Sequence, residues 1–526
     1  MNTARHAATL ALASALIGGS SFAQGQGSLN YLPAPDGPLT LASTGSRETS
    51  ANGPSYGSSI SGAGRFVLFQ SEASDLTPDV DHNGLNLDVF LYDNVLHTKR
   101  LVSRSINGGT GDGESRTGLL NGRLPVMSFD GRYSVFLSAA TDLTEDPDTN
   151  GAEDVFLYDR IADSVTLVSK TPEGAAGNGR CDPFFSISGT GRYIAFQSNS
   201  SDLTADVDTN GHFDVFLYDR VSDTTTLVSS ALSGDAGNGR SQYPIISLNG
   251  SAVVFDSTAT DLTPEARVAF ADAFYWDRTS GNTTLLSKTP AGVGGNLNSF
   301  PRSLSANGRY VVVESFATDL TKDPENNVVG VDIFLYDREN PSLRLVSRSM
   351  NGGTANDRSS GSSISADGRF IVFESPATDL TADVDNNSSG DGVDIYLYDA
   401  LLNDLELVST GLAGGTANDK SERPIISLDG RWVVFSSEGS DLTTDTDANG
   451  EQDVFLWERR TGEMRLVSRA AGGSTGNDWA GYPSLSYNGL YVSIDTKAND
   501  VTQQDDQNNE TDVAVYSRRS INFGGN

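Results

Sequence analysis

Short apolar segments repeat along the chain at a nearly constant spacing. In one of them, Val-Phe-Leu-Tyr stands between Asp214 and Asp219, with apolar residues on both alternating faces. A strand of that kind must be covered on both sides, as happens where sheets stack face to face. Versions of this segment start at Asp88, Asp154, Asp214, Asp272, Asp332, Asp394, Asp453 and Asp512. The steps are 66, 60, 58, 60, 62, 59 and 59 residues, and such a period predicts one closed or stacked array of repeats.

Each repeat contains four candidate strands. In the third repeat they cover residues 184–188, 192–198, 214–220 and 224–229. The first two are joined by a short turn, which is Asp-Gly or Asn-Gly in other repeats and so favours an antiparallel hairpin. Four antiparallel strands repeated eight times predict an all-β fold, a single β-propeller with eight four-stranded blades.

The two ends of the chain complement each other. The last repeat stops without a convincing fourth strand, whereas residues 38–43 form an orphan strand candidate before the first complete repeat. We expect this N-terminal strand to complete the last blade and close the ring, which pairs edges that would otherwise be exposed. The propeller would then occupy residues 38–526, after a flexible Gly/Ser/Pro-rich leader over 24–37.

The repeat has a recognisable motif. Residues 365–373 read Ser-Ala-Asp-Gly-Arg-Phe-Ile-Val-Phe, residues 427–435 are a close copy, and an Asp-Val-Phe-Leu-Tyr-Asp-like strand follows each. This pattern resembles the TolB-type, WD-repeat-like (PD-type) propeller repeat of exported bacterial proteins. The resemblance covers essentially the whole mature chain and implies a propeller with a binding or scaffold role. It names no ligand, because this fold hosts many functions.

The loop between the second and third strands is acidic in most repeats. In the third repeat, Asp206, Asp208, Asn210 and Asp214 occupy loop positions 1, 3, 5 and 9, and Gly211 occupies position 6. Alternate oxygen-bearing side chains on a tight loop are the ligands that Ca²⁺ prefers, and glycine permits the sharp turn. The loop resembles the calcium-binding hairpin loops of integrin α-subunit propellers. We therefore expect several structural calcium ions.

The predicted calcium ligands come from five repeats: the second, third and seventh have this spacing, the first has one extra residue before the final aspartate, and the sixth has an insertion there. They are Asp79, Asp81, Asn83, Asp88, Asp146, Asp148, Asn150, Asp154, Asp206, Asp208, Asn210, Asp214, Asp383, Asp385, Asn387, Asp394, Asp445, Asp447, Asn449 and Asp453. The fifth and sixth repeats carry weaker copies with insertions, the eighth carries a degenerate copy, and the fourth has Arg267 where a ligand would stand. Oxygen ligands disfavour transition metals. The alternative is that these residues only make good turns on a solvated rim.

Two other repeated aspartates are expected to be structural. An Asp-Leu-Thr triplet opens each loop, as at Asp142 and Asp202, and its carboxylate should bond the backbone of its own turn. The second aspartate of the third strand, as at Asp159 and Asp219, should orient the turn that follows.

The net charge and the N-terminal targeting signal limit the expected partners and the expected location of the protein. The net charge is −33, which argues against nucleic acids and anionic membranes as partners. Residues 1–23 have a basic start, an apolar run and a small-residue cleavage site after Ala23, as in a secretory signal peptide. No other apolar run approaches the roughly 20 residues of a membrane span. We expect an exported monomer in the periplasm or outside the cell, without a membrane anchor.

The residues typical of hydrolases are sparse. His6 leaves with the signal peptide, His82 and His212 lie within acidic loops, and no nucleophile elbow is present. Cys181 is the single cysteine, so an intrachain disulfide is excluded. The sequence favours a non-enzymatic calcium-binding propeller that binds a protein or a glycan on the face carrying the acidic loops. The alternative is a carbohydrate-active propeller enzyme, a polysaccharide lyase or glycoside hydrolase, because some propellers of the type it resembles cleave polysaccharides and aspartates that could act as paired carboxylates are numerous.

Overall fold

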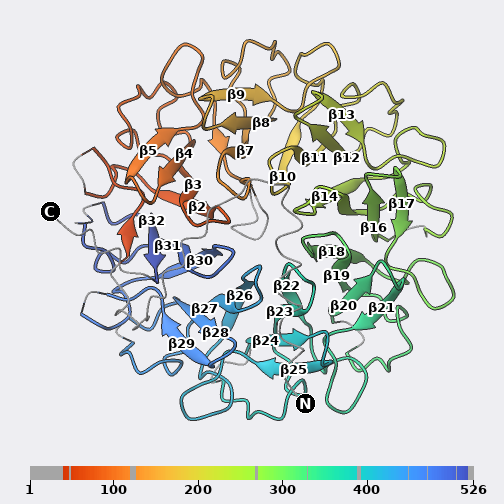
Figure 1. Cartoon of the computed structure of the whole chain (residues 1–526), viewed down its shortest axis with the longest axis vertical. Helices are drawn as coiled ribbons and strands as arrows, with labels where there is room; N and C mark the ends of the chain where they lie inside the picture. The colour runs from red at the N-terminus through yellow and green to blue at the C-terminus, as the bar shows by residue number, and fades with distance from the viewer. Residues whose placement is uncertain are drawn as a thin grey trace, which may run out of the picture.

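The structure is a computed structural model that describes residues 39–46, 49–118, 126–266, 270–327, 330–387, 392–447, 449–470, 472–504, 506 and 508–518. The predicted signal peptide (1–23) and leader (24–37) lie outside these residues. Eight four-stranded antiparallel sheets are arranged in a ring as the blades of a propeller, and we call the middle of this ring the channel (Figure 1). The predicted all-β, eight-bladed fold is confirmed. Within the described residues, no helix is long and apolar enough to cross a membrane.

Each blade is ordered from the channel outward. The innermost strands are β2 (Ser55–Ile60), β6 (Ser115–Arg116), β10 (Cys181–Ile187), β14 (Ser241–Ile246), β18 (Ser299–Leu304), β22 (Ser360–Ile364), β26 (Ser421–Ile426) and β30 (Ala480–Leu485). The second strands are β3 (Phe66–Ser71), β7 (Tyr133–Ser138), β11 (Tyr193–Ser198), β15 (Ala252–Ser257), β19 (Tyr310–Ser315), β23 (Phe370–Ser375), β27 (Trp432–Ser437) and β31 (Tyr491–Thr496).

The outer half of each blade follows the same order. The third strands are β4 (Asp88–Asp93), β8 (Asp154–Asp159), β12 (Asp214–Asp219), β16 (Asp272–Asp277), β20 (Asp332–Asp337), β24 (Asp394–Asp399), β28 (Asp453–Glu458) and β32 (Asp512–Ser517). The outermost strands are β5 (Thr98–Leu101), β9 (Ser164–Leu167), β13 (Thr224–Leu227), β17 (Asn282–Leu285), β21 (Ser342–Leu345), β25 (Asp404–Leu407), β29 (Glu463–Leu466) and β1 (Thr40–Leu41). Blades are numbered 1 to 8 in chain order, from β2–β5 to β30–β32 with β1.

The core consists of layers between neighbouring blades. All six residues of β11 are buried, because one face packs on the preceding blade and the other on the following blade. Within blade 3, Phe196 of β11 stacks on Phe216 of β12 at 5.6 Å between ring centroids. Tyr193 of the same blade packs in a cluster with Phe255 of blade 4. Strands that are apolar on both faces are thereby covered on both faces.

The ring closes through its N-terminal strand. β1 pairs antiparallel with β32, with Thr40 opposite Val515 and Leu41 opposite Ala514. The orphan strand therefore supplies the outermost strand of blade 8, as the sequence predicts. β1 covers the outer edge of β32. An uncovered edge strand could pair with another chain.

Backbone hydrogen bonds join all eight blades around one end of the channel. They connect the turns between first and second strands, from Ala63 to Phe129, Phe129 to Gly189, Gly189 to Leu248, Asn249 to Ala306, Ala306 to Ala366, Ala366 to Leu428, Asp429 to Tyr487 and Tyr487 to Gly62. We call this side of the ring the collar face. The opposite side, which carries the acidic loops and the loops between blades, is the loop face.

The two repeated aspartates expected to be structural have different partners. Asp219 Oδ1 accepts the Val221 N–H at 3.0 Å, which confirms its role in the turn, and its carboxylate also binds Arg192. The local bond predicted for the Asp-Leu-Thr carboxylate is wrong. Asp202 Oδ1 accepts the N–H of Asn178 at 2.9 Å, from the loop that enters the same blade. Asn178 and Asp202 are 24 positions apart, so the bond joins two loops instead of closing a local turn.

Candidate metal centres and the loop face

Each third strand opens with a buried aspartate that binds a serine. In blade 3, Ser229 Oγ donates to Asp214 Oδ1 at 2.6 Å and accepts the Val215 N–H at 3.0 Å. We call this arrangement the Ser–Asp clamp. The pairs are Asp88–Ser103, Asp154–Ser169, Asp214–Ser229, Asp272–Ser287, Asp332–Ser347, Asp394–Ser409, Asp453–Ser468 and Asp512–Ser43. The position-9 aspartates therefore have a structural role that needs no metal.

Burial raises the pKa of these clamp aspartates. For Asp214 it raises the pKa to about 7; the Ser229 hydroxyl and the Asn210 amide oppose that rise, and the Asp208 carboxylate adds to it. Burial likewise raises the pKa to about 7 at Asp88, Asp154, Asp332, Asp394, Asp453 and Asp512.

The asparagine at position 5 joins the same group. Asn210 Nδ2 donates to Asp214 Oδ2 at 2.8 Å and to the Gly237 carbonyl at 2.7 Å, and its N–H bonds Asp208 Oδ1 at 3.0 Å. Asn150 and Asn387 likewise donate to Asp154 and Asp394. Hydrogen bonds therefore bring loop positions 3, 5 and 9 together. The amide nitrogen of the asparagine is already used, because it links the acidic loop to the loop that enters the next blade.

Position 1 is placed differently from the other three. Its carboxylate lies near an arginine in two of the predicted loops: Asp445 Oδ1 is 2.9 Å from Arg469 Nη2, and Asp79 Oδ1 is 3.7 Å from Arg104 Nη2. An arginine at this place competes with a cation for the carboxylate. In blade 4, which lacks the motif, Lys288 Nζ lies 2.9 Å from Glu265 Oε1.

Whether an acidic loop can hold calcium depends on which of its oxygen atoms lack a hydrogen-bond donor. Among the described residues, no group of three or more His, Cys, Asp or Glu side chains is arranged to hold a metal ion. Calcium also takes amide and backbone oxygens. Both carboxylate oxygens of Asp148, the Oδ1 atoms of Asn83, Asn327 and Asn387, and Oδ2 of Asp512 are buried without a hydrogen-bond partner. Such oxygens are costly unless something satisfies them, so the loops of blades 1, 2, 5, 6 and 8 each have an oxygen atom that a cation could satisfy.

The loop face is braced at every blade. Asn178 bonds Asp202 through its N–H, donates from Nδ2 to Ser201 Oγ at 2.9 Å and accepts the Ser201 N–H at 3.0 Å. The bond to the Asp-Leu-Thr carboxylate recurs from Asn52, Asp112, Asn238, Asn296, Asn356, Asn418 and Asn477. The entering loop and the acidic loop of each blade are thus one unit.

The innermost strands carry a β-bulge that the sequence analysis missed. In blades 4, 7 and 8 the bulge places Tyr243, Arg423 and Tyr482 at φ 55°, 60° and 48°, whereas blades 1 and 6 have Gly57 and Gly361 at the same place in the repeat. The preceding blade caps the bulge, as where Glu374 Oε2 accepts the Arg423 N–H at 2.7 Å. Aligning the repeats would have revealed large residues at a position that is glycine in blades 1 and 6.

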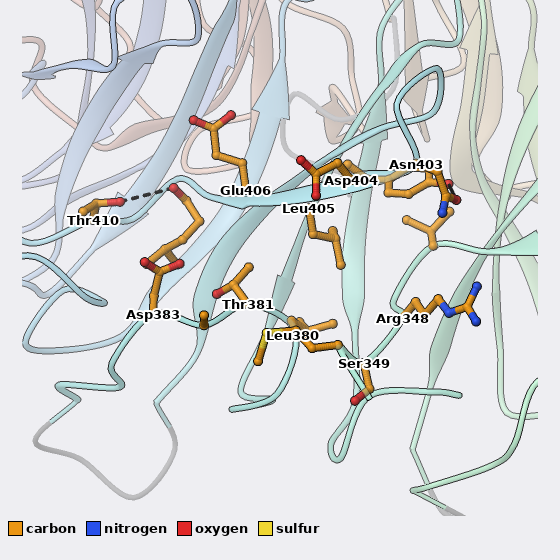
Figure 2. A pocket seen from close by; sticks show the side chains of 15 residues that line it. Arg348, Ser349, Leu380, Thr381, Asp383, Asn403, Asp404, Leu405, Glu406 and Thr410 are labelled. Atoms are coloured by element: carbon orange, nitrogen blue, oxygen red, sulfur yellow. Dashed lines mark hydrogen bonds between the residues drawn. The ribbon is translucent and has the colours of Figure 1, made fainter. Parts of the chain in front are cut away.

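An open groove of about 760 Å³ lies between blades 5 and 6. Figure 2 shows Asp383 and Glu406 toward one end of this groove and Arg348 at the other. Burial raises the pKa of Glu406. The groove therefore places the predicted calcium ligand Asp383 beside the outermost strand β25, away from the channel.

Comparisons with known proteins find structures with a similar fold. No protein-family model matches the chain, and no curated protein matches its sequence. The structure of Porphyromonas gingivalis dipeptidyl peptidase 4 has a TM-score of 0.50 at 12% identity, over 88% of this chain and 58% of that chain. An oligogalacturonate lyase in complex with manganese has 0.45 at 12% identity, over 91% and 96%. TolB from Acinetobacter baumannii has 0.31 at 12%, over 74% and 82%. TolB-type propellers are thus among the similar structures, and the likeness is one of fold.

Proposed function

We propose that the protein is an exported, calcium-stabilised β-propeller that binds a protein or a glycan on its loop face without catalysing a reaction. The observation that carries this proposal is the bracing of the loop face, where a backbone bond such as Asn178 to Asp202 ties two loops in every blade. A surface that is ordered before it binds loses less conformational entropy on binding. Export rests on the signal-peptide pattern of residues 1–23.

Calcium has a defined place in this proposal. Asp146, Asp148, Asn150 and Asp154 would hold an ion in blade 2, where the Asp148 carboxylate is otherwise unsatisfied. A bound ion supplies positive charge to a chain with a net charge of −33 and stabilises the folded state by binding it selectively. The equivalent residues of blades 1, 3, 6 and 7 are proposed as further sites.

Two candidate nucleophile or base residues, Cys181 and His97, lie away from the loop face, whereas His82 and His212 are exposed in its acidic loops. Cys181 is fully buried, and burial raises the pKa of its thiol to about 12. His97 Nδ1 lies 2.7 Å from the Tyr92 hydroxyl in a turn on the collar face. Neither group is presented to a ligand on the loop face.

The test compares variants on the two faces. Tagged protein is incubated with envelope proteins and with cell-wall polysaccharides, and retention is measured for Leu232→Glu/Leu412→Glu and for Val221→Glu/Leu401→Glu. The first pair is exposed in loops of the loop face, and the second in turns of the collar face. We expect only the first pair to lose retention. Equal retention by both pairs would refute the loop-face site, and turnover of any polysaccharide would refute the non-catalytic assignment.

A further inference from the structure

Two innermost strands bring aromatic and guanidinium groups together on the loop face. The residues are Glu422 and Arg423 of β26, Tyr482 of β30, and Gln452 and Trp479 of the loops beside them. The Arg423 guanidinium lies over the Tyr482 ring, 4.1 Å from its centroid. The Trp479 and Tyr482 rings meet edge to face with centroids 5.6 Å apart. We call these five residues the mouth cluster, because β26 and β30 border the channel (Figure 1).

Hydrogen bonds hold the polar members of the mouth cluster in place. Trp479 Nε1 donates to Gln452 Oε1 at 3.1 Å, and Gln452 Nε2 donates to Glu422 Oε1 at 2.9 Å. Arg423 Nε donates to the same Glu422 oxygen at 3.1 Å. The side chains are therefore fixed before any ligand arrives, which reduces the entropy lost on binding.

The backbone shows that these side chains are not required by the fold. Arg423 and Tyr482 adopt left-handed φ angles of 60° and 48°, where a side chain is strained. Gly57 and Gly361 occupy the same bulge position in blades 1 and 6 without that strain. Strained positions that a glycine would fill are concentrated at functional sites. The retained side chains therefore point to a ligand.

Two further features favour Trp479 as part of a binding surface. Of the four tryptophans, all within the described part of the chain, Trp276, Trp432 and Trp457 are 3–5% exposed, whereas Trp479 is half-buried. Gly481 makes room for its indole, since a Cβ at Gly481 would lie 2.7 Å from a ring carbon.

A second aromatic pair stands across the channel from the mouth cluster. Tyr243, at the same bulge position of β14, meets the Phe184 ring edge to face with centroids 4.4 Å apart. β14 and β30 lie on opposite sides of the channel (Figure 1). An extended ligand that crosses the opening would meet aromatic rings on both sides.

The chemistry of these groups fits a sugar chain. Aromatic rings offer apolar faces, and a sugar ring has an apolar face surrounded by hydroxyls. The amide of Gln452, the carboxylate of Glu422 and the guanidinium of Arg423 supply planar donors and acceptors beside those rings. We propose that the mouth cluster binds an oligosaccharide, with Tyr482 and Trp479 against sugar faces, Glu422 and Arg423 bonded to hydroxyls, and the buried Gln452 holding Trp479 and Glu422 in place. This proposal rests on the loop-face binding function proposed above.

The test uses the whole mature protein and defined hexasaccharides of β-glucan, xylan, mannan, chitin and galacturonan. Binding is measured by titration calorimetry and by protection of Trp479 fluorescence from acrylamide. We expect at least one hexasaccharide to bind, and Tyr482→Gly and Trp479→Ala each to weaken it by about tenfold or more, as for central anchors of an interface. Tyr487→Ala, an exposed aromatic on the collar face, should leave the affinity unchanged.

Tyr482→Gly separates binding from folding. Glycine is unstrained at this φ angle, so the melting temperature should fall by no more than about 2 °C. Equal hexasaccharide affinity in Tyr482→Gly and wild type would overturn the mouth cluster while leaving loop-face binding intact. Failure of all five hexasaccharides to bind would overturn the oligosaccharide assignment. Loss of protein retention in Leu232→Glu/Leu412→Glu would then show that the loop face binds a protein instead.

Discussion

Ser43 and Asp512, separated by 469 positions in the chain, share a hydrogen bond of 2.6 Å between Ser43 Oγ and Asp512 Oδ1. Ser43 Oγ also accepts the Val513 N–H at 3.0 Å. The seven other Ser–Asp clamps join residues 15 positions apart, as in Ser229 and Asp214. The ring is thus closed by the same contact that completes every other blade, supplied from the opposite end of the chain.

Removing the clamp between Ser43 and Asp512 should weaken the pairing of β1 with β32. We expect Ser43→Ala and Ser229→Ala each to lower the free energy of unfolding by about 1–3 kcal/mol, the usual cost of leaving a buried acceptor unsatisfied. Only Ser43→Ala should also speed amide hydrogen exchange in β32, because β1 pairs with it through just two residue pairs. Exchange in β32 that is equally slow in both variants would contradict the role assigned to β1.

Calcium should raise the melting temperature, because an ion that binds only the folded state stabilises it. Calorimetry in excess calcium and then in chelator measures the effect. Asp148→Asn should lower the number of bound ions by one, since both Asp148 oxygens lack a partner. Glu265→Gln, in the loop of blade 4 that lacks the motif, is the matched control and should leave that number unchanged. A melting temperature that is the same in calcium and chelator would rule out stabilising calcium sites.

The periodic part of this architecture was predictable from sequence. The spacing of the Asp-Val-Phe-Leu-Tyr-Asp segments fixes the blade count, and the orphan strand at residues 38–43 has one vacant edge to join. Both inferences use strand alternation and repetition, which are local signals. The convergence of Asp208, Asn210 and Asp214 was also predictable, because their spacing lies within one loop.

Contacts between strands and between blades were not predictable in the same way. The Ser229 partner of Asp214 lies on the next strand, and nothing in the acidic loop indicates it. The left-handed conformation of Tyr482 depends on a bulge whose register is set by pairing with β31. From sequence alone, a tyrosine in an innermost strand is indistinguishable from an ordinary core residue unless the repeats are compared position by position.

Cys181 should be unreactive while the protein is folded. Its side chain is fully buried, and burial raises the pKa of the thiol to about 12, so little thiolate forms at pH 8. We expect labelling by a thiol reagent to be limited by unfolding and to become rapid in denaturant. Labelling of the native protein as fast as that of the denatured protein would contradict this burial.

The seam between blades 8 and 1 contains a buried carboxylate. Asp495 Oδ2 accepts the Gly57 N–H at 2.9 Å, and Oδ1 accepts the Ser58 N–H at 3.4 Å. Asp495 is 2% exposed, and burial raises its pKa from 3.8 to about 7, against the effect of those two N–H groups. The folded state therefore binds a proton more tightly than the unfolded state between these pH values.

Stability should consequently decline as the pH rises from about 4 to 7, because the folded state must give up a proton that the unfolded state has already lost. The stabilising contribution is complete below the unfolded pKa and absent above the folded one. In chelator, Asp495→Asn should flatten the fall in free energy of unfolding between pH 5 and pH 8, although the amide loses one acceptor at every pH. Urea titrations at several pH values give these slopes. Wild type and Asp495→Asn with the same slope would show that Asp495 stays ionised in the folded protein.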